Sequence, residues 1–326
     1  MLAYVIRRLL YAIPILVGVN LLTFLLFFVV NTPDDMARMQ LGARRVTPEA
    51  IEKWKAERGY DFPLVWNSRE ESLLDKAGKT IFAQKSVKLF VFDFGYSEDK
   101  RDIASEIRER MWPSLALAVP VFLVGLAVCI TFALLMAFFR ATYVDLWGVV
   151  LCVGMMSVST LFYIIGGQYI ASKTWHLVPI SGYAGGFDAA RFLVLPVLIG
   201  IISGIGSSSR WYRTLFLEEM GRDYVRTARA KGLAESAVLF RHVLKNAMIP
   251  ILTGAVVVIP LLFLGSLLSE SFFGIPGLGS YTIDAIQSQD YAVVRAMVFL
   301  GSVFYIIGLI LTDISYTLVD PRIRLE

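Results

Sequence analysis

Histidine and cysteine, two residue types that carry much enzymatic chemistry, occur only twice each in this sequence. The two histidines, His176 and His242, are separated by a long apolar run, so they share neither a metal ion nor a catalytic step. No Gly-x-x-x-x-Gly-Lys phosphate loop is present, and the glycine cluster 274–279 is interrupted by Pro276, which prevents it from cradling ATP. Ser-His-Asp and His-Glu-x-x-His arrangements are also missing. We therefore expect no catalytic residue, no cofactor-binding residue and no metal site.

Three further reactive groups lie inside apolar runs. Cys129 and Cys152 are expected to behave as small apolar side chains rather than as a redox pair. Asp313 lies near the end of the last apolar run, where a carboxylate is more often a structural partner for a backbone or basic group than a proton carrier. None of these three groups indicates catalysis, so the apolar runs themselves are the most informative feature of the sequence.

Composition indicates an integral membrane protein. Hydrophobic residues make up 56% of the 326 positions, charged residues only 18%, and the mean hydropathy is +0.64. A crossing needs roughly 20 apolar residues, and six such runs predict an all-α polytopic membrane protein with about six transmembrane helices. The predicted spans are Leu9–Val30, Trp112–Phe139, Leu146–Ser172, Phe192–Ser209, Asn246–Ser269 and Ala296–Thr312.

The first run has an alternative interpretation as a cleaved signal peptide, since Arg7 and Arg8 precede it. Its length exceeds the usual apolar region of a signal peptide, roughly 7–15 residues, and no small-x-small cleavage site follows Val30. We expect it to be retained as a span.

The distribution of basic residues predicts the orientation. Eight arginines and lysines fall between residues 210 and 245, and the positive-inside rule assigns that segment to the cytoplasm. Both termini, with Arg7 and Arg8 at one end and Arg322 and Arg324 at the other, are then cytoplasmic. The net charge of +4 follows from this distribution and gives no case for binding nucleic acid.

The spans divide the chain into three expected regions: residues 1–30, a cytoplasmic stub and the first span; residues 31–111, an external (periplasmic) segment; and residues 112–326, the core with spans two to six. In the external segment, Thr47 and Pro48 predict a helix that ends at Gly59. A second helix is expected at 102–110, leading into the second span through Pro113.

The segment 210–247, which we call the elbow, carries more structure than a simple connector. Good helix formers predict a surface helix over 218–231, with Tyr224, Val225 and Ala228 on one face. Gly232 is a natural left-handed C-cap, and a second helix starting at Ala234 runs into span five without a turn signal. Ala228, Ala230 and Gly232 are interpreted as a small-residue surface that another protein could approach closely.

Two simpler interpretations of the elbow compete with this one. Its arginines and lysines could serve only to orient the chain in the bilayer. They could also bind lipid headgroups.

The elbow and four other stretches resemble one family. Asp223-Tyr224-Val225-Arg226-Thr227-Ala228-Arg229-Ala230-Lys231-Gly232-Leu233, followed by 241–250, is similar to the cytoplasmic coupling loop of bacterial ABC importer permeases, in the B-type subunit of the dipeptide, oligopeptide and nickel subfamily. The resemblance extends to Tyr4–Leu10, Ser269–Gly279, Asp290-Tyr291 and Asp320–Arg324, and so covers essentially the whole chain.

The resemblance implies a pore subunit of an ATP-driven importer in the bacterial inner membrane. It implies a second homologous permease subunit, cytoplasmic ATPase subunits that bind ATP and Mg, and an external substrate-binding protein as partners. The implied ATPase-coupling residues are Asp223, Tyr224, Arg226, Thr227, Ala228, Arg229, Ala230, Lys231, Gly232 and Leu233. The implied residues of the external gate or binding-protein side are Glu270, Phe273, Pro276, Gly277 and Gly279.

The substrate stays open, because dipeptides, oligopeptides, peptide antibiotics and nickel chelates are all carried by relatives of this subfamily. The alternative from another class is a secondary transporter driven by an ion gradient, which the scarcity of charges inside the spans disfavours. An intramembrane enzyme would need a titratable pair at one depth, which the sequence does not offer.

Overall fold

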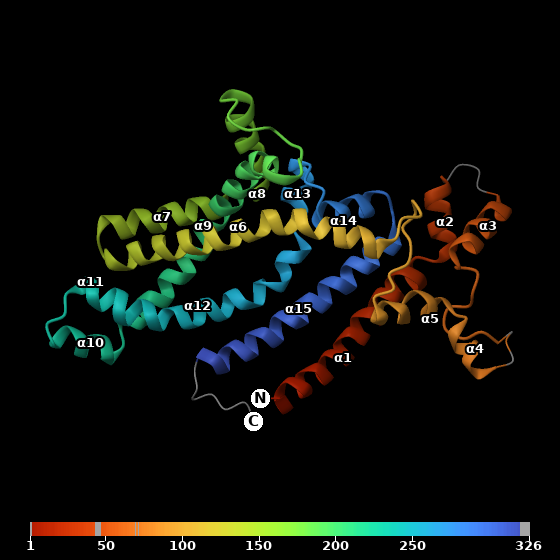
Figure 1. Cartoon of the computed structure of the whole chain (residues 1–326), viewed down its shortest axis with the longest axis horizontal. Helices are drawn as coiled ribbons and strands as arrows, with labels where there is room; N and C mark the ends of the chain where they lie inside the picture. Colours follow the sequence, from red (N-terminus) through yellow and green to blue (C-terminus); the bar gives the residue numbers. More distant parts are fainter. Residues whose placement is uncertain (1, 43–46, 69, 71, 320–326) are drawn as a thin grey trace. The chain divides into compact units, whose positions relative to one another are not determined.

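The computed structural model describes residues 2–42, 47–68, 70 and 72–319, and the terminal stretch Asp320–Arg324 lies outside the described residues. Within these ranges the chain is built from helices (Figure 1), with a single isolated antiparallel bridge between Tyr96 and Asp102. The predicted all-α fold is confirmed.

In the part of the chain that the structure describes, five long apolar helices could each cross a membrane. They comprise Ile6–Val30, within α1 (Leu2–Phe24) and the π-helical turns that follow it; Ile103–Phe138, which is α6; Ala189–Met220, which is α9; Glu235–Leu264, which contains α12 (Leu244–Val258); and Tyr291–Ser315, within α15 (Tyr291–Val319). Each contains most of one predicted span. Spans four and six are longer than predicted, because their helices continue past Arg191, Arg210 and Asp313.

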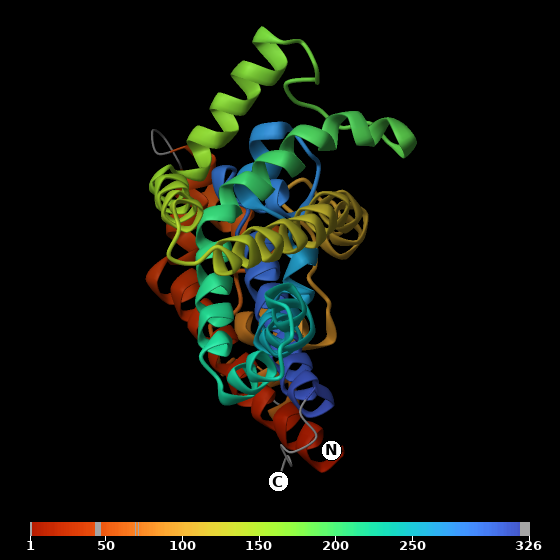
Figure 2. The same ribbon diagram turned by 90° about the vertical axis from the view of Figure 1, so that its left-hand side faces the viewer.

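The prediction of one continuous helix over the remaining span, Leu146–Ser172, is wrong. The span consists of α7 (Tyr143–Ser157) and α8 (Thr160–Gly167), which continues as a π-helical segment to Thr174, and the two halves are bent by 88°. Figure 2 shows α8 leaving the direction of α7. Val158 adopts an extended conformation at the break, and Ser157 bonds the carbonyl of Val153 with its hydroxyl. Serine and threonine side chains compete with the helical hydrogen bonds here, which favours a break.

The described chain forms two compact units. The first contains residues 2–109 and 282–306, and the second contains residues 110–281 and 307–319. The shorter helical segments are α2 (Pro33–Leu41), α3 (Pro48–Arg58), α4 (Leu73–Gly78), α5 (Ile81–Lys85), a 3₁₀ segment (Val87–Val91), another (Gly186–Asp188), α10 (Asp223–Ala230), α11 (Glu235–Val238), a π-helical turn (Leu239–Val243), a 3₁₀ segment (Pro260–Leu264), α13 (Leu267–Phe273) and α14 (Leu278–Gln287).

The first unit has an aromatic core. Phe24 and Phe28, from the first span, pack with Trp54, Tyr60 and Ile81 of the segment that follows. The predicted helix at 47–58 is confirmed as α3: the Thr47 hydroxyl accepts the Ala50 N–H, and Gly59 ends the helix at φ +67°.

In the second unit, α7 packs along α9 through small residues. A Cβ added to Gly206 would lie 2.6 Å from the carbonyl oxygen of Cys152, so only glycine allows this approach. Asp145 of α7 receives two hydrogen bonds from the Arg213 guanidinium, at 2.6 and 2.7 Å. This bidentate pair fixes the helices at one end, just where α9 enters the elbow.

Candidate functional site

The elbow lies wholly within the second unit and has two helical arms joined at Gly232. The first arm is α10, and the second runs from α11 through the π-helical turn into α12. Gly232 has φ +77°, and its N–H donates to the Arg229 carbonyl at 2.9 Å. A residue with a Cβ is strained at this φ, which explains the glycine. The predicted bend and the continuity of the second arm with span five are confirmed.

The predicted start of the first arm is wrong. Glu218, Glu219 and Met220 form the last turn of α9 rather than the beginning of a surface helix. Arg222 is extended, at φ −72° and ψ 151°, and Asp223 lies in the first turn of α10. An acidic side chain at that position favours a new helix N-terminus, because it faces the positive end of the helix dipole.

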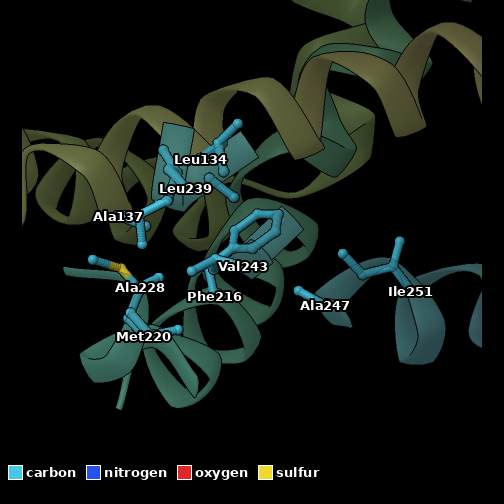
Figure 3. Close-up of a cluster of buried hydrophobic side chains, with 12 residues drawn as sticks. Leu134, Ala137, Phe216, Met220, Ala228, Leu239, Val243, Ala247 and Ile251 are labelled. Atoms are coloured by element: carbon cyan, nitrogen blue, oxygen red, sulfur yellow. The ribbon is translucent and has the colours of Figure 1, made fainter. Parts of the chain in front are cut away.

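The inner face of α10 is locked into the core of the second unit. Val225 is fully buried and Ala228 is only 4% exposed, and both belong to a cluster with Phe216 of α9 and Val243 of the π-helical turn. Figure 3 shows Ala228 beside side chains of α6 and α9. The interpretation of Ala228 as part of an open small-residue surface is therefore wrong: it anchors the arm instead.

The outer face of α10 and the bend are open to solvent. The exposed residues are Asp223, Arg226, Thr227, Ala230, Lys231, Gly232 and Leu233. The Thr227 hydroxyl donates to the Asp223 carbonyl at 3.0 Å, and Arg226 lies 3.4 Å from the Asp223 carboxylate. The helix α10 is therefore held in the core by its buried face and presents an exposed, largely polar face to solvent.

Polar contacts join the arms of the elbow. The Arg229 guanidinium donates to both carboxylate oxygens of Glu235, at 2.8 and 3.2 Å, across the Gly232 bend. The Tyr224 hydroxyl donates to Glu219 at the end of α9. Burial, aided by this hydrogen bond, raises the pKa of Tyr224 to about 12, so the hydroxyl stays a donor. These contacts tie α10 to the end of α9 and to the start of the second arm.

Sequence reasoning missed the side chains that hold α10 in place. Val243, Ala247 and Ile251 are buried at i, i+4, i+8 spacing along the second arm, and Phe216 is buried on α9. The spacing is a signal that could have identified the first three. No sequence signal pointed to the Asp145–Arg213 pair, because the partners are 68 residues apart.

A second predicted group surrounds Glu270, whose side chain is fully buried in the second unit. Its carboxylate accepts hydrogen bonds from the backbone N–H groups of Ser266 at 3.1 Å, Gly279 at 2.7 Å and Ser280 at 3.1 Å. The last two belong to the first turn of α14, where the helix dipole favours an anion. Burial raises the pKa of Glu270, and the hydrogen bonds, including one with Ser114, oppose that rise.

Glycines make room for this carboxylate. A Cβ at Gly265 or Gly277 would overlap the Glu270 carboxylate, and one at Gly279 would lie 2.6 Å from the Ser266 carbonyl carbon. Gly265 also has φ +70°. We call Glu270, these glycines, Ser114, Ser266 and Ser280 the glutamate cradle. Gly277 and Gly279 belong to the predicted gate group, and Gly265 does not.

The predicted gate residues are mostly internal. Phe273 is 2% exposed and packs with Leu117 and Ile164, while Glu270, Gly277 and Gly279 are buried in the cradle. Pro276 is the exposed member of the predicted group. The cradle therefore fixes the loop that presents Pro276 rather than offering a surface of its own.

Comparison with known proteins places the chain in a family. The family described as "Binding-protein-dependent transport system inner membrane component" matches residues 110–325, and its N-terminal companion family matches residues 1–118. A Brucella abortus protein named for a peptide transport system permease is 33% identical over 332 residues, which cover 100% of both chains. The dipeptide transport system permease protein of Escherichia coli is 31% identical over 352 residues, which cover 99% of both. The chain therefore belongs to the family of binding-protein-dependent transport system inner membrane components.

Proposed function

We propose that this chain is one of two pore subunits of an ATP-driven importer and that it moves peptides or a related small solute by alternating access. The chain itself is a multi-pass inner membrane transport subunit and not an enzyme. The peptide assignment rests on relatives whose names refer to peptide or dipeptide transport. The energy comes from ATP and Mg bound by partner ATPases, with a second permease and a binding protein completing the complex.

The observation that carries the proposal is the two-faced construction of α10. Its inner face is buried against helices that could span the membrane, and its outer face is exposed and polar. An ATPase groove that grips the outer face moves the spans as rigid bodies, because well-packed helices shift together rather than deform.

The proposed orientation puts the elbow and both termini in the cytoplasm and the 31–111 segment outside. It is supported by the basic residues of 210–245. The same orientation puts the exposed Pro276 on the external side, where a binding protein delivers its ligand. The predicted division into regions 1–30, 31–111 and 112–326 belongs to this proposal.

An uptake assay with a matched pair of variants tests the proposal. Arg226→Gln changes the exposed face of α10, whereas Arg210→Gln changes an exposed arginine of α9 outside that arm. In proteoliposomes containing the whole complex, we expect Arg226→Gln to lower ATP-dependent peptide uptake about tenfold, as a lost charged contact does. Arg210→Gln should transport normally.

Two results would count against it. Normal uptake by Arg226→Gln would remove α10 from the ATPase interface. Uptake by the chain alone, driven by an ion gradient without ATP, would favour the secondary transporter.

A further inference from the structure

The first unit contains a polar pocket that neither the elbow nor the glutamate cradle uses. Its volume is about 760 Å³, within the roughly 300–1,000 Å³ common for small-molecule sites. It is lined by side chains from 57–60, 84–88 and 93–100 and by Ala292 and Arg295 of α15. All of these residues belong to the same unit.

Arg295 is the unusual member of the lining. The residue is 4% exposed, and its guanidinium lies over the Phe28 ring at 4.8 Å from the ring centroid. Its Nε donates to the Tyr291 carbonyl at 3.2 Å, but its Nη1 is buried and has no hydrogen-bond partner among the described residues. A buried cationic donor left in this state is costly, so native proteins rarely keep one without a use.

The neighbouring carboxylates already have other partners. Asp290 accepts the backbone N–H groups of Glu98 at 2.8 Å and Val293 at 3.2 Å. Glu98 is paired with Arg58, whose Nε donates to it at 2.8 Å. The charge of Asp290 acts on Arg295, but no carboxylate of the described residues forms an ion pair with it. An anion from outside the chain would give the Nη1 of Arg295 a hydrogen-bond partner.

The pocket has a surplus of positive charge. Five basic residues line it, Arg58, Lys85, Lys88, Lys100 and Arg295, against three acidic ones, Glu57, Asp93 and Glu98. The acidic groups pair with Arg58 and Lys88. Burial, together with the charges of Arg295 and Lys88, lowers the pKa of Lys85 to about 8. A bound anion would relieve this repulsion.

We propose that this pocket binds the carboxylate of a small solute, with Arg295 as its main anchor and Lys85 as a second cation. The planar guanidinium suits a carboxylate, to which it donates parallel hydrogen bonds. This inference deepens the proposed function and rests on it for the solute class, since the C-terminus of a short peptide is such a carboxylate. The proposed orientation places the pocket outside, where an incoming solute would meet it.

A direct binding measurement on the full chain in lipid nanodiscs tests the pocket. The probes are N-acetyl-dialanine and its C-terminal amide, which differ in the carboxylate and contain no amine that titrates. We expect the acid to bind at least about tenfold more tightly than the amide. Arg295→Gln should remove that preference, and Arg101→Gln, an exposed arginine outside the pocket, should keep it.

Lys85→Gln supplies an independent test should the Arg295 variant fold poorly. Protonated Lys85 attracts the carboxylate, so affinity for the acid should fall severalfold as pH rises from 7 to well above about 8. The groups that act on Lys85 are Arg295, Lys88, Glu98, Asp93 and Tyr60. The pKa of Tyr60 is raised by burial, so its hydroxyl stays neutral over this range. Lys85→Gln should abolish the pH dependence.

Equal binding of acid and amide, or an unchanged preference in both variants, overturns the pocket proposal whatever the transport assay shows. Conversely, carboxylate binding that depends on Arg295 in a chain whose complex imports no peptide leaves the pocket standing and overturns the peptide assignment. The two failures are therefore distinguishable.

Discussion

Glu270 and Arg295 are both charged side chains removed from solvent, one in each compact unit, and their surroundings are opposite. The Glu270 carboxylate accepts three backbone N–H groups, and glycines leave room for it. The Arg295 guanidinium has a buried Nη1 without a hydrogen-bond partner among the described residues, and Arg295 is part of the lining of the polar pocket. A fully satisfied buried charge stabilises a loop, whereas an unsatisfied one indicates a place for a ligand.

The largest expected effect comes from emptying the glutamate cradle. Glu270→Ala leaves three buried N–H groups without an acceptor, and we expect a loss of about 3 kcal/mol or more in the free energy of unfolding. Glu235→Ala, which removes an exposed carboxylate, should lose about 1 kcal/mol or less. Unfolding of the purified protein in detergent measures both. Equal losses would show that the hydrogen bonds to Glu270 do not stabilise the loop more than a surface ion pair does.

Filling the cradle should have a smaller effect. In Gly277→Ala the new methyl group overlaps the Glu270 carboxylate, so the free energy of unfolding should fall by about 1–3 kcal/mol. Gly154→Ala is the matched control, because a Cβ there meets no atom within 4 Å, and it should stay within about 1 kcal/mol. The same detergent assay measures both variants. Equal free energies of unfolding would contradict the close contact between Gly277 and the Glu270 carboxylate.

The stability of the cradle should depend on pH. Burial raises the pKa of Glu270 above its ordinary value of 4.5. The folded state therefore holds this proton more tightly, and the resulting stabilisation is present below pH 4.5 and lost as pH rises through the raised pKa. Unfolding of wild type and Glu270→Gln between pH 4.5 and 7 measures the difference. We expect the wild type to lose stability relative to the variant as pH rises; an opposite slope would refute the raised pKa.

The smallest effect is expected at Arg295. Arg295→Met replaces an unsatisfied buried cation by an apolar side chain of similar length, so the free energy of unfolding should change by about 1 kcal/mol or less, in either direction. A loss as large as that of Glu270→Ala would make Arg295 a structural residue and remove the contrast between the two charges. Detergent unfolding without added solute is the measurement.

Much of the fold follows from local signals. Apolar runs located the spans, and Thr47, Pro48 and Gly59 bounded α3. The same signal at Thr32 and Pro33 was passed over, although Thr32 caps α2 and Pro33 occupies its first turn. The 88° break in the third span was missed, because the apolar run continues through Val158.

The candidate site was less accessible to sequence reasoning. The Gly232 bend was predicted from one residue type, but the burial of Ala228 depends on Phe216 and Val243, which reach it through packing between elements. The burial of Arg295 could not be predicted either, since an arginine near the start of an apolar helix is ordinarily a snorkelling residue. Its environment is created by residues 57–100, far away in the sequence.

Site-specific photo-crosslinking in the assembled complex tests whether the elbow contacts an ATPase subunit and whether Pro276 lies beside the substrate-binding protein. The native cysteines, Cys129 and Cys152, are buried, so a benzophenone maleimide should react with one introduced cysteine at a time. Leu233, at the elbow bend, is 40% exposed, and Pro276 is exposed beside the cradle. We expect Leu233→Cys to crosslink to an ATPase subunit and Pro276→Cys to crosslink to the substrate-binding protein. Crosslinking of Leu233→Cys to the binding protein, or of neither position to its partner, would contradict this expectation.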